Sequence, residues 1–500
     1  MKYFVSRSIY TFNSGTEHSQ ANRTIMFNEH NDAARYITRD YNRLWVRDAE
    51  RVNLSSNEVL NMYDYFQGTT KVAVTQNPIR AFSQIAFNEY QLVDHGPNYS
   101  TIDHAGRQLA RINILPGTVG LVGDVEYYDR FDTLTSRDNF DWRGFKSSVD
   151  YFHPNGALGS RRFLNQDGDV VLENIYMNID GQLQPTMWKL INYQGRDYRF
   201  DTEDQLFLFF LNEVMKTTQD NVIVSDHRDT DYVVADVQNV QSKWVAFHGL
   251  HADNHGMPFA AFTVALETRA NDFDGIIVPT TKQKNAILRD FNQLNVKVGS
   301  DIAISEKHLA EEEVWLRDRI EGRIIFSGRL EADKRPMEAL QAFLKVVKLV
   351  PKATFEFRGY TNDQQLLNDM KQVVNQNSMQ ERVIFGEYLT DSEMEEFYNK
   401  AQVIVNTSVG EAQGMHLIEA MEHGIPVVAY DTNYAINGLV ENDVNGYVVT
   451  NGDQDQMAHR LQQILDNNVL WSKLSKAAYQ KAREFSSEQI YKQWRNIFQN

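Results

Sequence analysis

Residues 410–421 read GEAQGMHLIEAM, and this stretch decides the fold. It follows a short strand-like run, Val403 to Thr407, and its glycines precede a helix-forming segment. A strand, a glycine-bearing turn and a helix in this order form one βα unit of a parallel sheet. The first N–H groups of such a helix carry partial positive charge, so we expect an anion such as phosphate, or a hydroxyl group, to bind there.

Two carboxylates, Glu411 and Glu419, stand eight positions apart in this stretch. Glu411 lies before the turn and Glu419 lies in the helix, so both can face one ligand at the carboxyl ends of the strands. The other residues that we expect to contact this ligand are Gln413, Gly414, Met415, His416 and Leu417. The spacing alone leaves an alternative open, in which Glu411 is a loop charge and Glu419 a solvated helix residue.

Two positively charged side chains are expected at the same edge of the predicted sheet. The segment SGRLEADKRP, residues 327–336, follows the first strand of this domain and contains Arg329 and Lys334. Cations fixed in a site of low dielectric stabilise the charge that develops on a departing diphosphate, and they do so without a metal. Taken alone, each of the two would more often be a surface charge.

The remaining pattern predicts an α/β protein with two doubly wound domains. From residue 302 onward, strand-like runs alternate with helical stretches, and similar runs occur near both ends of residues 1–301. We place one Rossmann-like domain at 1–69 and 201–301, a second at 302–485, and a C-terminal helix at 486–500 that is expected to return to the first domain.

Residues 70–200 have a different sequence pattern and are predicted to form an antiparallel β-meander inserted in the first domain. Turn tripeptides at 154–156, 166–168 and 179–181 recur between runs rich in aromatic and aliphatic residues. Because such a sheet exposes edges and a face, we expect it to support a homo-oligomer. A self-contained layer without a partner is the open alternative.

The amino-acid composition argues against several classes of protein and of binding site. The 500 residues are 42% hydrophobic and 23% charged, as in globular proteins, and they include no cysteine. Disulfides and cysteine metal sites are thereby excluded, and a net charge of -17 argues against nucleic acid as a partner. No apolar run reaches the roughly 18 residues of a membrane span, and the N-terminal residues lack a signal-peptide pattern. We therefore expect a cytoplasmic protein.

The ordered set SGRLEADKRP, GEAQGMHLIEA, GIPVVAYD and NGYVV resembles the C-terminal domain of family-4 retaining glycosyltransferases of the GT-B fold. Ser14, Gly15 and Thr16 are similar to the family's glycine-bearing loop near the donor phosphates, and His248 to its sugar-contacting histidine. With the β-rich insertion, the chain resembles bacterial enzymes that glycosylate serine-rich repeat adhesins for accessory secretion, and enzymes that α-glycosylate teichoic acids.

The resemblance implies two Rossmann-like domains that face each other across a cleft and a reaction that retains configuration. GlcNAc or glucose would pass from a UDP-sugar to Ser or Thr of a serine-rich polypeptide, or alternatively to a polyol-phosphate chain at the inner membrane face. His248, Arg329, Lys334 and Glu411 would act in catalysis, Glu419 would bind the ribose, and no metal or other cofactor would be required. Departures from the commonest pattern at Ala412 and at 434–437 leave the identity of the sugar open.

Two other classes of protein are weighed beside this one. A sugar-nucleotide epimerase would share the architecture but would need no acceptor. A non-catalytic chaperone subunit would bind the acceptor without transfer, although the presence of all four charged residues at 329, 334, 411 and 419 argues against it. Aspartate pairs at 167 and 169, 229 and 231, and 272 and 274 match the D-x-D metal motif of another fold, and we discount them because the cations at 329 and 334 replace the metal.

Overall fold

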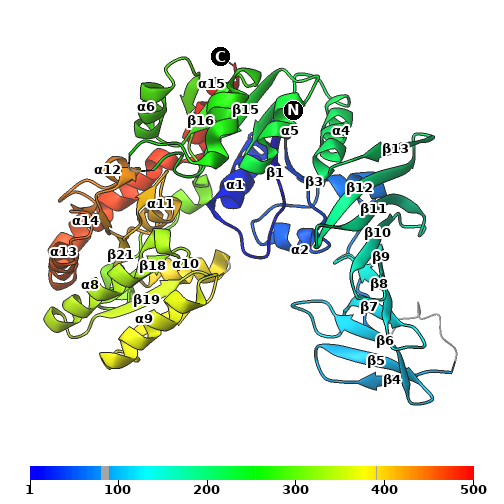
Figure 1. Ribbon diagram of the computed structural model, residues 1–500. Helices are drawn as coiled ribbons and strands as arrows, with labels where there is room; N and C mark the ends of the chain where they lie inside the picture. The colour runs from blue at the N-terminus through cyan, green and yellow to red at the C-terminus, as the bar shows by residue number, and fades with distance from the viewer. Residues whose placement is uncertain (80–88, 254, 390, 500) are drawn as a thin grey trace. The chain divides into compact units, whose positions relative to one another are not determined.

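The computed structural model describes residues 1–79, 89–253, 255–389 and 391–499 (Figure 1). The chain divides into two compact units. The first comprises Met1–Thr11, Ala34–Ile223 and Tyr232–Gln241, and the second comprises Phe12–Ala33, Val224–Asp231 and Ser242–Asn500. The domain boundaries drawn from the sequence stay a prediction.

The first unit begins with a parallel sheet. Strands β1 (Lys2–Ser6), β2 (Ala34–Thr38) and β3 (Val59–Asn61) pair in parallel in this order, and the start of β14 (Val222–Ser225) reaches β1 through a hydrogen bond from Val222 N–H to the Met1 carbonyl. Every residue of β14 is buried, as expected for a strand that is covered on both faces. The helices of this part are α2 (Trp45–Glu50), α3 (Met62–Gln67), α4 (Glu203–Met215) and α5 (Asp231–Asp236), of which α5 begins at the boundary of the units.

The rest of the first unit is a ten-stranded antiparallel sheet in which each strand pairs with the next one in sequence. The prediction of a β-meander is confirmed, and its strands run from cyan to green in Figure 1. Asp180 and Gly181, with φ of 51° and 81°, form the two-residue turn of its longest hairpin, a conformation that suits the twist of paired strands. The strands are β4 (Gln91–Asp94), β5 (Tyr99–His104), β6 (Arg107–Ile114), β7 (Val122–Tyr128), β8 (Leu134–Phe140), β9 (Lys146–Phe152), β10 (Leu158–Leu164), β11 (Val170–Ile179), β12 (Gln182–Tyr193) and β13 (Arg196–Phe200).

Buried contacts attach this meander to α3. The ring of Phe163 on β10 packs 4.7 Å from that of Tyr63, and the side-chain amide of Gln67 donates to the Leu164 carbonyl at 2.6 Å. Arg143, which is buried, forms an ion pair with Asp64 of α3 at 2.7 Å. The meander is therefore continuous with the α/β part of its unit.

The second unit contains two groups of parallel strands. The end of β14, β15 (Ser242–Ala246), β16 (Gly275–Val278) and β17 (Val296–Val298) form the first group. The second is a six-stranded sheet with the order β20-β19-β18-β21-β23-β25, and all of its pairs are parallel. Its strands are β18 (Arg323–Ser327), β19 (Thr354–Arg358), β20 (Val383–Gly386), β21 (Val403–Asn406), β23 (Val427–Tyr430) and β25 (Gly446–Val449), and the first five coincide with strand-like runs of the sequence.

Alternate residues of the six-stranded sheet enter two separate cores. Ile324 and Phe326 of β18 belong to one cluster of buried side chains, whereas Ile325 between them belongs to the other. This alternation is what a strand covered on both faces requires. The covering helices are α8 (Pro336–Leu349), α9 (Gln364–Gln376) and α13 (Gln454–Asp466) with the first cluster, and α10 (Asp391–Asn399), α11 (Met415–Glu422), α12 (Ile436–Leu439) and part of α14 (Asn468–Ala482) with the second.

The C-terminal helix, α15 (Ser487–Gln499), packs on α1 (Gly15–Glu29) within the second unit. The ring of Phe498 lies 5.9 Å from that of Phe27, and the guanidinium of Arg23 lies 4.4 Å above the fully buried Trp494 ring. Two further helices of this unit are α6 (Thr281–Asp290), between β16 and β17, and α7 (Glu306–Leu309), in the linker that joins the two groups of strands.

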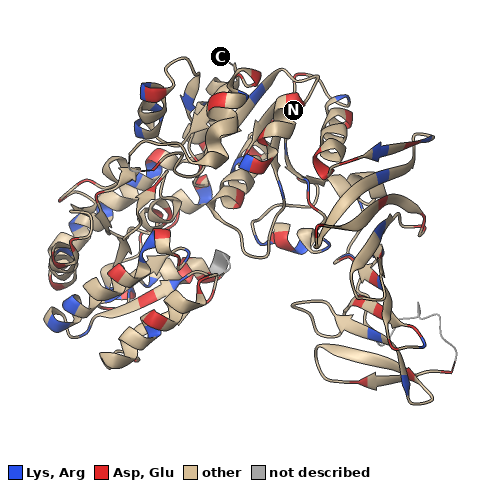
Figure 2. Ribbon diagram, in the orientation of Figure 1, with Lys and Arg blue, Asp and Glu red and all other residues tan. Residues whose placement is uncertain are grey.

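Charged residues are interspersed along the ribbon. Figure 2 shows Lys and Arg alternating with Asp and Glu on helices and strands, unlike the basic stripe typical of nucleic-acid-binding proteins. Among the described residues, no helix has both the length and the hydropathy needed to cross a membrane.

Candidate functional site

The site is built where β21 ends and α11 begins. Gly414 adopts a left-handed conformation, with φ of 76°, and serves as the N-cap of α11. Glycine adopts this conformation without the strain that a side chain would impose. The Leu417 N–H donates to the Gly414 carbonyl and its side chain is buried in the core, so the start of the helix is held firmly at this position.

Glu411 and Lys334 form a close ion pair at this point. The Lys334 ammonium donates to Oε1 of Glu411 at 2.6 Å, and Ser408 and Asn406 also donate to this oxygen, at 2.6 and 3.2 Å. Burial alone would raise the pKa of Glu411, but the positive charge of Lys334 and these hydrogen bonds outweigh it and lower the pKa to about 2. Glu411 is therefore an ionised acceptor at neutral pH.

His416, on the first turn of α11, stays neutral. Its Nε2 lies 3.0 Å from the amide nitrogen of Asn406. Burial lowers the pKa of His416 to about 4, and the nearby Lys334 acts in the same direction. Met415 precedes it, and its sulfur lies 3.9 Å from the position that a Cβ atom on Gly15 would occupy.

The N-terminus of α1 thus lies beside the N-terminus of α11. Ser14 caps α1 in a capping box, in which its N–H and hydroxyl both donate to Glu17, at 2.8 and 2.6 Å, while its Oγ accepts from Thr16 N–H. The predicted residues Ser14, Gly15 and Thr16 therefore form the N-cap and the start of a helix whose N-terminus lies next to Met415. Two helix N-termini at one place favour a ligand with more than one negative charge.

Arg329 lies after β18 and is more exposed than Lys334. Its side chain, 40% exposed, pairs with Asp333 at 3.0 Å. The loop that carries it lies against the loop after β19, where a Cβ on Gly359 would stand 2.0 Å from the Gly328 carbonyl oxygen. Only glycine permits this approach, so Gly359 fixes the start of the Arg329 loop.

Glu419 lies one helical turn beyond His416 and is held by a tyrosine. The Tyr398 hydroxyl donates to Glu419 Oε2 at 3.0 Å and lies 3.3 Å from Ser327 Oγ. Burial, together with the neighbouring Glu419 carboxylate, raises the pKa of Tyr398, so the phenol stays protonated and remains a donor. Glu419 is thereby oriented at the carboxyl ends of β18 and β21.

His248 follows β15 and lies between two carboxylates. Its Nδ1 is 2.7 Å from Asp301 and its Nε2 is 2.8 Å from Asp226, which also pairs with Arg23. Burial acts to lower the pKa of His248, but the two carboxylates outweigh it and raise the pKa to about 9. Gln413 contacts the same segment, since its Oε1 accepts from Asp301 N–H and its Nε2 donates to Ser300 Oγ, both at 2.6 Å.

The residues that form hydrogen bonds with the predicted site residues were not themselves predicted from the sequence. Asp226 directly follows a strand-like run, as catalytic groups of parallel sheets often do, and this position was a usable signal. Tyr398, Asn406 and Ser408 carry no comparable signal, because their contacts depend on the packing of separate helices and loops. Asp301 lies 53 residues from His248, and only the fold brings them together.

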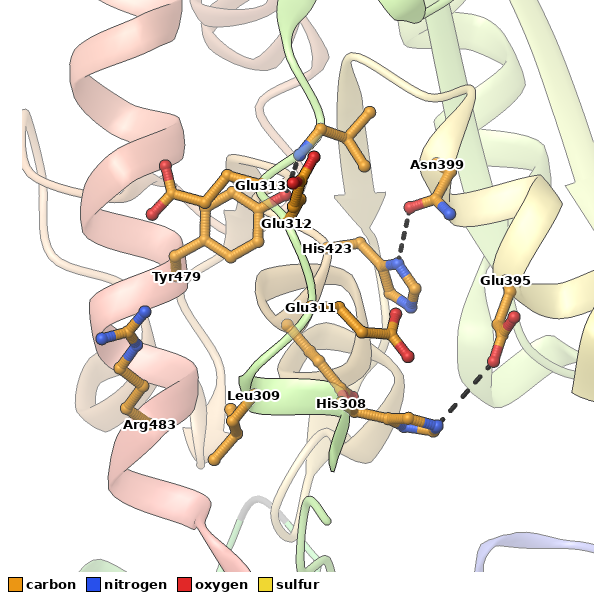
Figure 3. A pocket seen from close by; sticks show the side chains of 12 residues that line it. His308, Leu309, Glu311, Glu312, Glu313, Glu395, Asn399, His423, Tyr479 and Arg483 are labelled. Atoms are coloured by element: carbon orange, nitrogen blue, oxygen red, sulfur yellow. Dashed lines mark hydrogen bonds and ion pairs between the residues drawn. The ribbon is translucent and has the colours of Figure 1, made fainter. Parts of the chain in front are cut away.

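The hollow in Figure 3 lies at the other end of α11. His308 pairs there with Glu422 at 3.2 Å, and Nδ1 of His423 is 2.8 Å from the Asn399 amide oxygen. Several glutamates line this hollow, so it does not suit a diphosphate. Within the described part of the chain, no group of three or more His, Asp or Glu side chains is arranged so that it could hold a metal ion. Independence from metals stays a prediction.

Comparison with known proteins defines the class. Residues 310–485 match the family model "Glycosyl transferases group 1". This part of the chain is therefore a group 1 glycosyltransferase domain, and the whole chain has the GT-B fold predicted from the sequence, with parallel sheets and an antiparallel ten-stranded insertion.

Individual relatives give a more specific comparison. The chain is 22% identical to the UDP-N-acetylglucosamine–peptide N-acetylglucosaminyltransferase GtfA subunit of Streptococcus agalactiae, over 98% of this chain and 97% of that protein. It is 26% identical to the poly(ribitol-phosphate) alpha-N-acetylglucosaminyltransferase of Staphylococcus aureus, over 59% and 58%. Among solved structures, pneumococcal GtfA in complex with UDP and GlcNAc superimposes with a TM-score of 0.85 at 18% identity, covering 100% of this chain and 98% of that one.

Proposed function

We propose that this protein is a retaining glycosyltransferase that transfers GlcNAc or glucose from a UDP-sugar to Ser or Thr of a serine-rich polypeptide. The observation that carries the proposal is the meeting of the α1 and α11 N-termini beside the Lys334–Glu411 pair. This arrangement joins positive dipole ends and a cation, which suit a diphosphate, to an ionised carboxylate, which suits sugar hydroxyls.

In this proposal Arg329 and Lys334 bind the diphosphate, and no metal is needed to neutralise it. Lys334 exchanges part of its contact with Glu411 for a phosphate oxygen when the donor binds. The charge on the departing phosphate is largest in the transition state, so a cation already in place lowers the barrier. Glu419, oriented by Tyr398, accepts hydrogen bonds from the ribose.

Glu411 and the main-chain amides of residues 413–415 hold the sugar. The acceptor hydroxyl attacks from the face that the diphosphate leaves, and the departing phosphate takes its proton. No strongly basic side chain is then required, and the low pKa of Glu411 agrees with a role as a hydrogen-bond acceptor instead of a base.

Two acceptors follow from the relatives. A polypeptide is favoured because the GtfA relative aligns over 97% of its own length, insertion included. A polyol-phosphate chain at the inner membrane face is the second candidate, since the chain is also similar to the poly(ribitol-phosphate) alpha-N-acetylglucosaminyltransferase of Staphylococcus aureus.

We propose in addition that the meander mediates assembly, as a homo-oligomer or with a partner protein. A structure described as a GtfA/B complex has the fold of this chain, with a TM-score of 0.79. Apolar side chains exposed on the β11–β12 hairpin, at Met177, Ile179 and Leu183, support a contact there. We place the enzyme in the cytoplasm, which agrees with a cysteine-free sequence.

The test is an incubation of the purified protein with UDP-GlcNAc, UDP-glucose or UDP-galactose. Each donor is offered alone, with a serine-rich polypeptide and with poly(ribitol phosphate), and UDP release and product mass are measured. We expect a polypeptide that gains the mass of one or more sugars. An epimerised UDP-sugar without acceptor would indicate an epimerase, and acceptor binding without UDP release would indicate a chaperone subunit. Either result would refute the proposal.

A further inference from the structure

A buried polar network connects the carboxyl ends of three parallel strands in the second unit. Asp226 follows β14, His248 follows β15, and Asp301 lies three residues beyond β17. Both ring nitrogens of His248 lie within 2.8 Å of these carboxylates, and only 5% of its side chain is exposed. A neutral imidazole has one N–H donor, so two carboxylate acceptors require the doubly protonated ring.

The segment that carries Asp301 is held on several sides. The Ser300 N–H donates to Gln493, and the Ser300 carbonyl accepts from the Trp494 indole at 2.9 Å. A Cβ on Gly299 would lie 3.0 Å from the Trp494 ring, so this linker passes close to α15. The Ser19 hydroxyl of α1 also donates to Asp301, at 3.2 Å.

Gln413 connects this segment to the sugar-binding stretch. Gln413 is only 4% exposed. Its side chain makes two short hydrogen bonds, one to Ser300 and one to Asp301. Two residues before it in the same stretch stands Glu411. The amide of Gln413 is therefore the direct physical link between the Glu411 loop and the partner of His248.

We propose that Gln413 is a positioning residue which, through Ser300 and Asp301, holds His248 as an imidazolium in one orientation beside the donor. This inference rests on the proposed function, because the donor is what the fixed positive charge serves. The network supplies a buried cation, His248, in addition to Lys334. It also makes the Glu411 loop and His248 move together when the donor binds.

The electrostatics agree with this geometry. The pKa of His248 is raised to about 9 by Asp301 and Asp226, against the effect of burial. The cations that face the network are Arg23 of α1, which pairs with Asp226, and Arg228, whose guanidinium lies 4.7 Å from the Phe247 ring. Arg23 also lowers the pKa of Asp226, which keeps this carboxylate charged beside His248.

The test follows the side chain of His248 directly. ¹⁵N NMR of the histidine rings is recorded from pH 5 to 10, and His248 is assigned by the signal lost in His248→Gln. We expect both nitrogens to stay protonated up to about pH 9 in the wild type. In Asp301→Asn, the removal of one carboxylate should lower this titration by about one pH unit or more.

Enzyme kinetics then distinguish a positioning role of Gln413 from a general loss of folding. In Gln413→Ala we expect kcat to fall about tenfold or more, with the KM for the UDP-sugar nearly unchanged, because a reacting geometry is lost and a binding contact is not. Gln413→Glu keeps the acceptor for Asp301 N–H and should restore part of the activity. Gln402→Ala is the matched control, since Gln402 is equally buried and accepts from Gly322 N–H at 2.6 Å.

The inference is overturned if wild-type His248 is neutral at pH 7, if Gln413→Ala leaves both kcat and the histidine signals unchanged, or if Gln402→Ala lowers kcat as much. A wild type that transfers no sugar from any donor would refute the proposed function. The histidine signals of the wild type and of Gln413→Ala would still show whether Gln413 holds His248 as an imidazolium, because they need no turnover.

Discussion

Replacing Glu411 with Gln tests the charge at the centre of the site. The structure places this carboxylate, 9% exposed, against Lys334, Ser408 and Asn406. Its pKa falls from 4.5 to about 2 on folding, which corresponds to about 3 kcal/mol of stability at pH 7. Gln cannot supply the charge, and Lys334 loses its partner, so we expect the variant to lose roughly this amount.

The sign of the pH dependence follows from the direction of the shift. A lowered folded-state pKa contributes stability that is complete above 4.5 and is lost as the pH falls toward about 2. The difference between wild type and variant should therefore shrink to roughly 1 kcal/mol at pH 3. Urea unfolding, followed by tryptophan fluorescence at pH 7 and pH 3, measures both differences.

Turnover provides the second measurement. Loss of a charged acceptor at the sugar should lower kcat by roughly 100-fold, the scale of other lost electrostatic contacts. An equal loss of stability at pH 7 and pH 3 would show that the charge of Glu411 is not its source. A variant that unfolds more easily but turns over normally would make Glu411 a structural residue only.

Three further outcomes are expected. Lys334→Ala should lower turnover by roughly 100-fold, whereas Lys348→Ala, on the exposed face of α8, should not, and equal activity of the two variants would remove Lys334 from the mechanism. Transfer should survive EDTA because Arg329 and Lys334 neutralise the diphosphate, and a loss that magnesium restores would contradict this. Aspartates at Met177 and Leu183 should yield a smaller species by light scattering, and an unchanged mass would exclude this hairpin from the assembly contact.

Much of the fold could be predicted because its signals are local. The run at 403–407 is short, apolar and followed by a glycine-bearing turn, and it became β21. Gly414 was expected at a turn before a helix, and its φ of 76° shows why glycine stands there. The hairpin turns of the meander were equally visible, since Asp180-Gly181 is a turn by its own backbone preferences.

The site was predictable in its charged groups but not in what orients them. Lys334 and Glu411 lie 77 positions apart, and each followed a strand-like run, so their meeting at one sheet edge could be expected. Gln413 was expected to face the ligand, and nothing in the sequence indicates that its side chain bonds to Ser300 and Asp301. That contact depends on how the linker after β17 packs against the turn before α11, and local sequence patterns do not encode such packing.

The packing of α15 on α1 has a consequence for how the chain is made. During synthesis α1 leaves the ribosome early, whereas Trp494 follows only after the entire six-stranded sheet has been translated. Until then Arg23 lacks the ring that covers it, and the backbone of Ser300 lacks its indole donor. Helix α1 and the linker thus reach their final surroundings only when α15 has been made, so a nascent chain has no finished site before α15 emerges.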